Sequence, residues 1–283
     1  MNLLFLTPLY NDWESLKILL KNINQELKKI KRKAEILIIN DCSTTNEKLN
    51  KNKLKYIKKI TILNLKKNIG SQKSIFLGLK YIKKKKYKGI LTILDSDGED
   101  DVKKIKLMIK KAQDNPAAII LAVRTKRLEG IFLQLINKTR LFINYVLIGN
   151  FINFGNFSSF NLNILKKLLK NNNLWIAYSS GVQKNYNNFV YINSEKKKRY
   201  FGNSKVNLKF LIKHSLNILS IYWKLIGFKS LVFICITSFF MKEAIFITVL
   251  ILFFLNTLII LNFKIEYNNY LKINYLKNIR TYN

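Results

Sequence analysis

The chain has 283 residues, of which 49% are hydrophobic, enough for one α/β domain of roughly 200 residues and a smaller segment. Its formal charge of +34 has three competing explanations: nucleic-acid binding, attraction to an anionic membrane, or a genome bias toward Lys, Asn and Ile codons. Whatever its origin, so basic a surface attracts phosphates and anionic lipid. The single histidine, His214, excludes a multi-histidine metal site, and Cys42 and Cys235 lie too far apart for a metal-ligand motif.

Apolar, β-branched runs alternate with helical patterns from the N-terminus onward. Strands are predicted at residues 3–6, 34–39, 60–65, 90–94 and 118–123, and helices at 13–31, 72–83 and 102–113. Pro8 cannot donate to a ladder, so the first strand should end there, and Asp12 is placed to cap the next helix. This alternation predicts an α/β fold with a mostly parallel sheet flanked by helices. The first residues lack the features of a signal peptide, so we expect the bulk of the chain in the cytoplasm.

The fourth predicted strand runs into a dense group of carboxylates, Asp95-Ser96-Asp97-Gly98-Glu99-Asp100-Asp101. Two aspartates one residue apart suit a hard divalent cation that substrate phosphates complete. The alternative interpretation is an acidic turn that favours the dipole of the following helix. Polar turns also follow the first two strands, at residues 10–12 and 40–43. In a doubly wound sheet these turns meet at one edge, which predicts a nucleotide pocket there.

The second half of the chain differs in composition from the first and no longer shows regular alternation of strand and helix patterns. An apolar, aromatic stretch covers residues 141–160, where phenylalanines recur every three residues. We expect a helix there, either buried in the core or lying at a membrane interface. Residues 244–263 carry no charge and are long enough to cross a bilayer, and residues 218–241 form a shorter apolar segment. We favour a helical hairpin with both ends in the cytoplasm and a basic tail after it; a single span with an interfacial helix is the alternative.

Five short motifs occur in an order that resembles a known family. They are Thr7-Pro8-Leu9-Tyr10-Asn11-Asp12, Asn40-Asp41-Cys42-Ser43, Asn68-Ile69-Gly70, Asp95-Ser96-Asp97-Gly98-Glu99 and Arg199-Tyr200-Phe201-Gly202-Asn203-Ser204-Lys205. The chain resembles the membrane-associated family 2 glycosyltransferases, in particular polyprenyl-phosphate sugar synthases of the dolichol-phosphate mannose and bactoprenol glucose type. The resemblance covers residues 3–210 and implies a GT-A fold, a Rossmann-like mixed sheet, followed by transmembrane helices.

The resemblance also implies a function. A sugar would pass from a nucleoside-diphosphate sugar to a polyprenyl phosphate at the cytoplasmic (inner) membrane face, without nucleic acid as a partner. The family pattern is compatible with a homo-oligomer. The domain would cover residues 1–213, with an interfacial helix around 141–160, and the membrane segment residues 214–283.

The same resemblance implies roles for individual residues. Mg²⁺ or Mn²⁺ would be held by Asp95, Asp97 and Glu99. The donor would contact Pro8, Tyr10, Asp12, Asp41, Gly70, Asp95, Ser96, Asp97 and Arg199. The catalytic group would comprise Asp97, Arg124, Arg127 and Lys205, with Arg140 as a further candidate for binding phosphate; the alternative for each basic residue is solvated surface charge.

The chain departs from the family pattern at several positions. Asn40 and Cys42 replace Asp and Gly in the second motif. Asn156 stands where relatives often carry an aspartate that can act as a general base, which an asparagine cannot do. A lipid phosphate is already an anion and needs no general base. A glycan or lipid-linked oligosaccharide acceptor remains the alternative, and Asn156 argues mildly against it. A non-enzymatic protein that binds membranes or nucleic acid through charge alone leaves the carboxylates unexplained.

Overall fold

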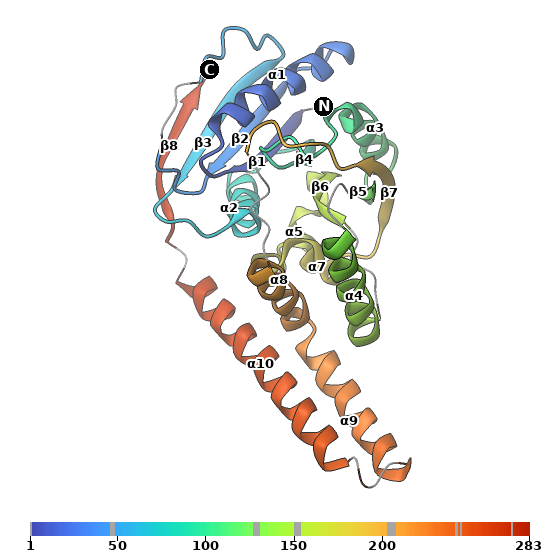
Figure 1. Cartoon of the computed structure of the whole chain (residues 1–283). Helices are drawn as coiled ribbons and strands as arrows, with labels where there is room; N and C mark the ends of the chain where they lie inside the picture. Colours follow the sequence, from blue (N-terminus) through green and yellow to red (C-terminus); the bar gives the residue numbers. More distant parts are fainter. Residues whose placement is uncertain are drawn as a thin grey trace.

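The computed structural model describes residues 2–45, 49–126, 131–149, 154–202, 208–240, 243, 245–272 and 274–283. A sheet domain lies at one end, and two long helices project from it as a hairpin (Figure 1). The elements are β1 (Leu3–Leu9), α1 (Trp13–Lys29), β2 (Ala34–Asn40), β3 (Ile57–Leu65), α2 (Ser71–Lys84), β4 (Ile90–Ile93), α3 (Ile105–Asp114), β5 (Ile119–Lys126), α4 (Ile131–Ile148), β6 (Phe154–Asn161), α5 (Leu165–Leu168), α6 (Asn173–Ile176), α7 (Tyr178–Asn185), β7 (Phe189–Glu195), α8 (Leu208–Ile221), α9 (Trp223–Phe240), α10 (Ile245–Leu271) and β8 (Leu276–Tyr282).

The described strands form one eight-stranded sheet in the order β7-β5-β6-β4-β1-β2-β3-β8. β1, β2, β3 and β4 pair in parallel, and β6 is antiparallel to both of its neighbours. The predicted α/β class and mixed, mostly parallel sheet are therefore confirmed. Alternate residues of β1 face different layers: Leu4 and Leu6 pack with α2, and Leu3 and Phe5 pack with α1 and α3. Burial of both faces explains why these strands read as continuous apolar runs.

Pro8 does not end the first strand, contrary to the prediction. β1 continues to Leu9, with Pro8 opposite Ile39 of β2. The carbonyl of Leu6 accepts a bond from Leu94, so even-numbered residues direct their polar groups toward β4. β4 pairs with β1 only as far as Leu6, and the N–H that Pro8 lacks would therefore point to a side where no strand needs it.

The helix expected over residues 141–160 is wrong for its second half. α4 ends at Ile148, and residues 154–161 form β6, in the middle of the sheet. Phe154 and Phe160 belong to the core on one face of the sheet and Phe157 to the core on the other. A spacing of three puts successive side chains on opposite faces of a strand, which suits a strand buried on both sides.

The C-terminal residues, expected as a basic tail, form β8 instead. β8 pairs antiparallel with β3 at the edge of the sheet. Asn40 donates to Asn64 at 2.8 Å and Asn64 to Asn278 at 2.6 Å, so a row of amides crosses β2, β3 and β8. The chain therefore leaves the sheet domain through α9 and returns to it after α10 (Figure 1).

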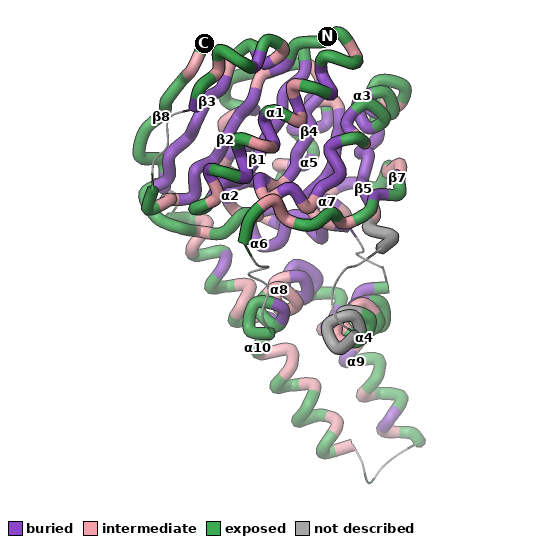
Figure 2. Tube along the Cα trace, turned by 45° about the horizontal axis from the view of Figure 1, so that its top comes forward, coloured by how far each residue is buried: buried purple, intermediate pink, exposed green. Residues whose placement is uncertain are grey.

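α9 and α10 are long and apolar enough to cross a membrane. Only 17% and 6% of their apolar windows are buried. In Figure 2 the two helices extend away from the sheet and are mostly exposed or intermediate, whereas the strands are largely buried. A soluble core helix would be covered, so this exposure is weak support for membrane association.

Candidate functional site

A cavity of about 390 Å³ opens where β1, β2 and β4 end. It is lined by Pro8, Leu9, Tyr10, Asp12, Asp41, Ser71, Gln72, Asp95, Ser96, Asp97, Glu99, Gly155, Asn156, Arg199, Phe210 and His214. We call it the acidic cavity, because five of these side chains are carboxylic acids. Its position at the carboxyl ends of parallel strands is the usual ligand site of such sheets.

The acidic turn after β4 is covered by the segment of residues 196–202. Gly98 has a φ of +87°, and a Cβ atom there would lie 2.5 Å from the ring of Tyr200. The Tyr200 backbone N–H donates to the carbonyl of Asp97 at 3.0 Å, and its hydroxyl accepts from Asn22 at 2.8 Å. Glycine is therefore required at position 98 both by the turn and by the close approach of this ring.

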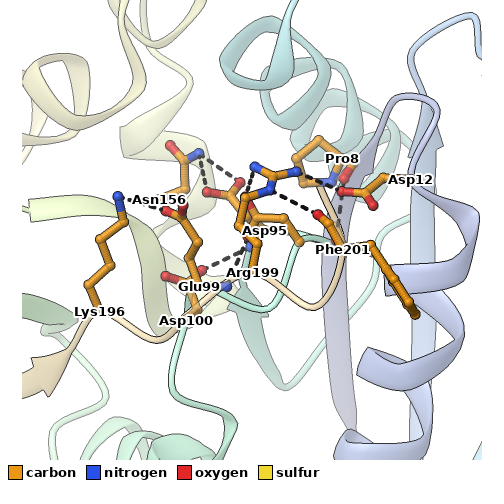
Figure 3. A network of polar contacts seen from close by, with 11 residues as sticks. Pro8, Asp12, Asp95, Glu99, Asp100, Asn156, Lys196, Arg199 and Phe201 are labelled. Atoms are coloured by element: carbon orange, nitrogen blue, oxygen red, sulfur yellow. Dashed lines mark hydrogen bonds and ion pairs between the residues drawn. The ribbon is translucent and has the colours of Figure 1, made fainter. Parts of the chain in front are cut away.

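Arg199 joins two carboxylates from different parts of the chain (Figure 3). Its guanidinium donates to Asp97 at 2.8 Å and to Asp12 at 3.0 Å, and all three side chains are at most 17% exposed. Asp12 does stand at the N-terminal boundary of α1, but its side chain makes no capping bond. The predicted cap is wrong because the stronger, charge-assisted bond to Arg199 takes the carboxylate instead.

Asp95 is held from the opposite side of the cavity. The amide of Asn156, on β6, donates to its two carboxylate oxygens at 2.9 and 3.3 Å (Figure 3). The backbone N–H of Asp95 in turn donates to Asp100 at 2.9 Å. Asn156 thus orients a carboxylate and does not supply a base.

Glu99 forms an ion pair with Lys196 at 3.2 Å, and both side chains are at most 13% exposed. A metal ion would have to compete with this ammonium group for Glu99. Among the residues that the structure describes, no group of three or more His, Cys, Asp or Glu side chains is placed to hold a metal. Asp95 and Asp97 line one cavity and provide the hard oxygen ligands that Mg²⁺ or Mn²⁺ takes together with substrate phosphates and water. The chemistry of these two residues fits a divalent ion, which would have to compete with the guanidinium of Arg199 for Asp97.

Asp41 fixes the backbone just before the N-terminus of α2. Its two carboxylate oxygens accept the backbone N–H groups of Ile69 and Gly70, both at 2.8 Å. Burial raises the pKa of Asp41 above its usual value, while these two bonds and the charge of Lys73 oppose the rise. Gly70, at φ +90°, precedes the helix without supplying a side-chain cap.

The structure brings most of the predicted site residues together. Those that line the acidic cavity are Pro8, Tyr10, Asp12, Asp41, Asp95, Ser96, Asp97, Glu99 and Arg199. Gly70 lines an adjoining cavity. Arg124 lies in β5 with its backbone opposite Ser194, and Arg127 and Lys205 fall outside the described residues.

Sequence reasoning missed two residues of α8 that line the acidic cavity, Phe210 and His214. Their rings stack with centroids 6.1 Å apart. Burial, and to a smaller degree the charge of Arg140, lowers the pKa of His214 from 6.5 to about 4, so the imidazole is neutral at pH 7. The spacing of four residues on one helix face was the available signal.

Residues 5–169 match the family model for glycosyl transferase family 2. The chain belongs to this family. The match covers more than half of the chain and confirms the family-level expectation of a glycosyltransferase enzyme. No curated protein sequence matches the chain.

Several solved structures are similar to the chain at low sequence identity. Glucosyl-3-phosphoglycerate synthase from Mycobacterium tuberculosis, in complex with Mn²⁺, UDP-glucose and phosphoglyceric acid, is 10% identical, with 80% of each chain covered and a TM-score of 0.54. Residues 1–349 of S. aureus TarS are 14% identical, with 96% of this chain and 92% of that chain covered and a TM-score of 0.47. A longer TarS structure is 15% identical with a TM-score of 0.45; the match covers 82% of this chain but only 39% of that one. The mycobacterial structure supports the GT-A-like fold.

Proposed function

We propose that this chain transfers a sugar from a nucleoside-diphosphate sugar to a polyprenyl phosphate at the cytoplasmic face of a membrane. The observation that carries the proposal is the acidic cavity itself. It combines Asp95 and Asp97 at the sheet edge with Phe210 and His214 of α8, the helix that leads into the hairpin. The proposed donor site and the helix that leads into the proposed membrane segment therefore share one wall.

The donor half of the proposal rests on charge and position. Asp95 and Asp97 would hold Mg²⁺ or Mn²⁺, which when bound neutralises charge on the nucleoside-diphosphate leaving group. The mycobacterial neighbour was solved with Mn²⁺ and UDP-glucose, which supports a nucleotide-sugar donor and a divalent ion here. Tyr10, 38% exposed at the rim, would contact the base together with Pro8 and Asp41.

The protein groups would act mainly by positioning. Asn156 holds Asp95, and Arg199 holds Asp97 against Asp12, so both carboxylates are oriented before the donor arrives. Arg199 can also donate to a donor phosphate, because a planar guanidinium suits phosphate oxygens. Among the predicted cationic residues, Arg124, Arg127 and Lys205 remain proposals for the same task.

The acceptor half rests on what the cavity offers a nucleophile. Asn156 occupies the position where relatives often carry a base and cannot remove a proton from a hydroxyl. A phosphate monoester is already anionic, so its oxygen can attack the anomeric carbon without a base. We therefore favour a lipid phosphate over a glycan hydroxyl.

The membrane location rests on the hairpin. Both of its ends connect to the sheet domain, since α8 packs on the domain before α9 and β8 joins the sheet after α10. Helices that cross a membrane from this domain would therefore cross it twice and return. We propose a membrane segment of α9 and α10, with residues 1–221 and β8 on the cytoplasmic side.

Replacement of Asp97 tests the mechanism. Asp97→Ala and Asp97→Asn should lower Mn²⁺-dependent turnover of UDP-sugars in detergent by roughly a hundredfold to a thousandfold, with an unchanged circular dichroism spectrum. Asp114→Ala, an exposed aspartate at the end of α3, is the matched control and should retain activity. Undecaprenyl phosphate and saccharide acceptors are compared in parallel. Full turnover in the Asp97 variants would refute the donor site, and transfer to saccharides alone would refute the lipid acceptor.

A further inference from the structure

A second cavity of about 430 Å³ adjoins the acidic cavity. The two share Ser71, Gln72, Phe210 and His214 in their walls. Its other lining residues include Lys67, Lys73, Lys213, Asn217 and Asn269. Among the described residues that line it, three are lysines and none is acidic, so we call it the basic cavity.

The two cavities are opposite in charge although they share a wall. A phosphate group without its own metal ion would be repelled by the carboxylates of the acidic cavity and attracted by the lysines of the basic cavity. Lys73 is already paired with Glu266 at 2.6 Å. Lys67 and Lys213 are exposed, and neither forms an ion pair within the part of the chain that the structure describes. The ammonium of Lys67 lies over the ring of Tyr275, 4.8 Å from its centroid, and this ring also lines the basic cavity. Neither ammonium has a carboxylate partner among the described residues, so both can bind an incoming anion.

The walls of the basic cavity come from both parts of the molecule. Lys67 and Lys73 lie at the sheet edge and in α2, whereas Lys213 and Asn217 lie on α8 and Asn269 near the end of α10. The exposed side chains of Leu208 and Ile212, 56% and 60% accessible, continue the same helix α8 with an apolar surface. A ligand with a phosphate at one end and an apolar chain at the other fits the basic cavity together with the neighbouring apolar surface of α8.

We infer that the basic cavity binds the phosphate monoester of the acceptor, with Lys67 and Lys213 as its principal charged contacts. This inference rests on the proposed lipid-phosphate acceptor. The acceptor phosphate enters from the side of α8 and α10, and its oxygen faces the acidic cavity across the shared wall at Gln72 and His214. The donor diphosphate and the acceptor phosphate are thereby kept in separate, oppositely charged compartments until transfer.

Binding of a soluble lipid-phosphate analogue tests the site. Farnesyl phosphate, farnesol and inorganic phosphate are titrated into the 283-residue protein in detergent, and UDP with Mn²⁺ is titrated separately. In Lys67→Gln/Lys213→Gln we expect farnesyl phosphate to bind roughly tenfold to a hundredfold more weakly, and UDP to bind within twofold of the unmodified protein. The control Lys66→Gln/Lys209→Gln removes equal charge from the same two segments at positions that line neither cavity, and should bind both ligands normally.

Each outcome separates this inference from the proposed function. Farnesyl phosphate binding that is equally strong in both double variants overturns the site but leaves the lipid acceptor standing. A parallel loss of UDP binding in Lys67→Gln/Lys213→Gln assigns the basic cavity to the donor and overturns the inference. Absence of farnesyl phosphate binding to the unmodified protein overturns the proposed acceptor and this site together. Binding of inorganic phosphate that the same variant loses supports recognition of the phosphate, and farnesol binding at equal strength argues for the chain alone and against the site.

Discussion

The sheet domain and the α9–α10 hairpin place the same residue types in opposite environments. Phe5 and Phe160 in the sheet are at most 1% exposed, whereas Phe239 and Phe240 at the end of α9 are 81% and 83% exposed. The sheet domain covers its own apolar surface with helices on both faces. The hairpin needs an external apolar phase for the same purpose, which supports the proposed membrane location.

The two regions also differ in how they are held together. The sheet domain is stabilised by two apolar cores, one on each face of the sheet, and the hairpin joins one of them through Ile226 of α9 and Ile259 of α10. Buried polar contacts add to this junction. Glu266 of α10 pairs with Lys73 of α2 at 2.6 Å, and its carbonyl accepts the indole N–H of Trp175 at 3.1 Å. The charge of Lys73 also opposes the rise in the pKa of Asp41 that burial causes. Lys73 therefore pairs with the hairpin through Glu266 and acts electrostatically on Asp41 of the acidic cavity.

Loss of Glu266 should have the largest effect, because it breaks a buried ion pair between the two regions. Glu266→Ala leaves the ammonium of Lys73, 17% exposed, without its partner and should destabilise the protein by about 3–5 kcal/mol. The measurement is thermal unfolding in detergent. The double variant Lys73→Met/Glu266→Met should recover most of the stability, since no uncompensated charge remains. The exposed Glu195–Lys197 pair is the control, and Glu195→Ala should cost less than about 1 kcal/mol. A similar small loss in Glu266→Ala would show that the ion pair does not join the two regions.

Gly98→Ala changes the sheet domain alone. The substitution meets a φ of +87° and the ring of Tyr200 at 2.5 Å, so strain of about 1–2 kcal/mol and overpacking of about 1–3 kcal/mol should add. Tyr200 would move away from the acidic turn together with Arg199, and Mn²⁺-dependent turnover should fall. Gly149→Ala has a comparable φ of +85° with no atom within 4 Å of the new Cβ, and it should show the strain without the loss of turnover. Equal effects of the two substitutions would mean that the Tyr200 contact is unimportant.

The same contrast explains which features the sequence predicts. Strands β1, β2 and β4 and helices α1 and α2 follow from local periodicity, and the meeting of Asp12, Asp41 and Asp97 follows from parallel connectivity. β8 cannot be predicted in this way, because its register depends on pairing between residues as far apart in the chain as Asn64 of β3 and Asn278 of β8. The sequence also does not predict that Asp12 pairs with Arg199 and leaves the α1 N-terminus uncapped, or that His214 lines the cavity. Both depend on contacts between residues that are far apart in the chain. The phenylalanines of β6 recur every three residues, a pattern that is also compatible with a helix. Only the pairing of this segment with its two neighbouring strands identifies it as a strand.

His214 lies at the junction of the two regions and should make stability depend on pH. Its pKa is about 4 in the folded protein against 6.5 ordinarily, first because of burial and then because of Arg140 on α4. The unfolded chain therefore binds more protons between these values, and stability is lost as the pH falls from 6.5 toward 4. Compared with His214→Gln, the unmodified protein should lose roughly 2–3 kcal/mol more between pH 7 and pH 4. Denaturant unfolding at several pH values measures the difference, and parallel curves would contradict it.

Asn256→Leu acts within the hairpin and should have the smallest effect. The Asn256 amide donates to the Ser230 hydroxyl of α9 at 2.9 Å and to the Leu252 carbonyl of its own helix at 2.8 Å. Interhelical bonds of this kind contribute about 0.6 kcal/mol on average and at most about 1.7 kcal/mol in membranes, and leucine restores apolar packing. Thr257→Val removes a bond that stays within α10 and should be nearly neutral. Unfolding in lipid bicelles measures both. A cost for Asn256→Leu as large as that of Glu266→Ala would mean that the helices are held to each other as firmly as the hairpin is held to the sheet domain, and the contrast between the two regions would fail.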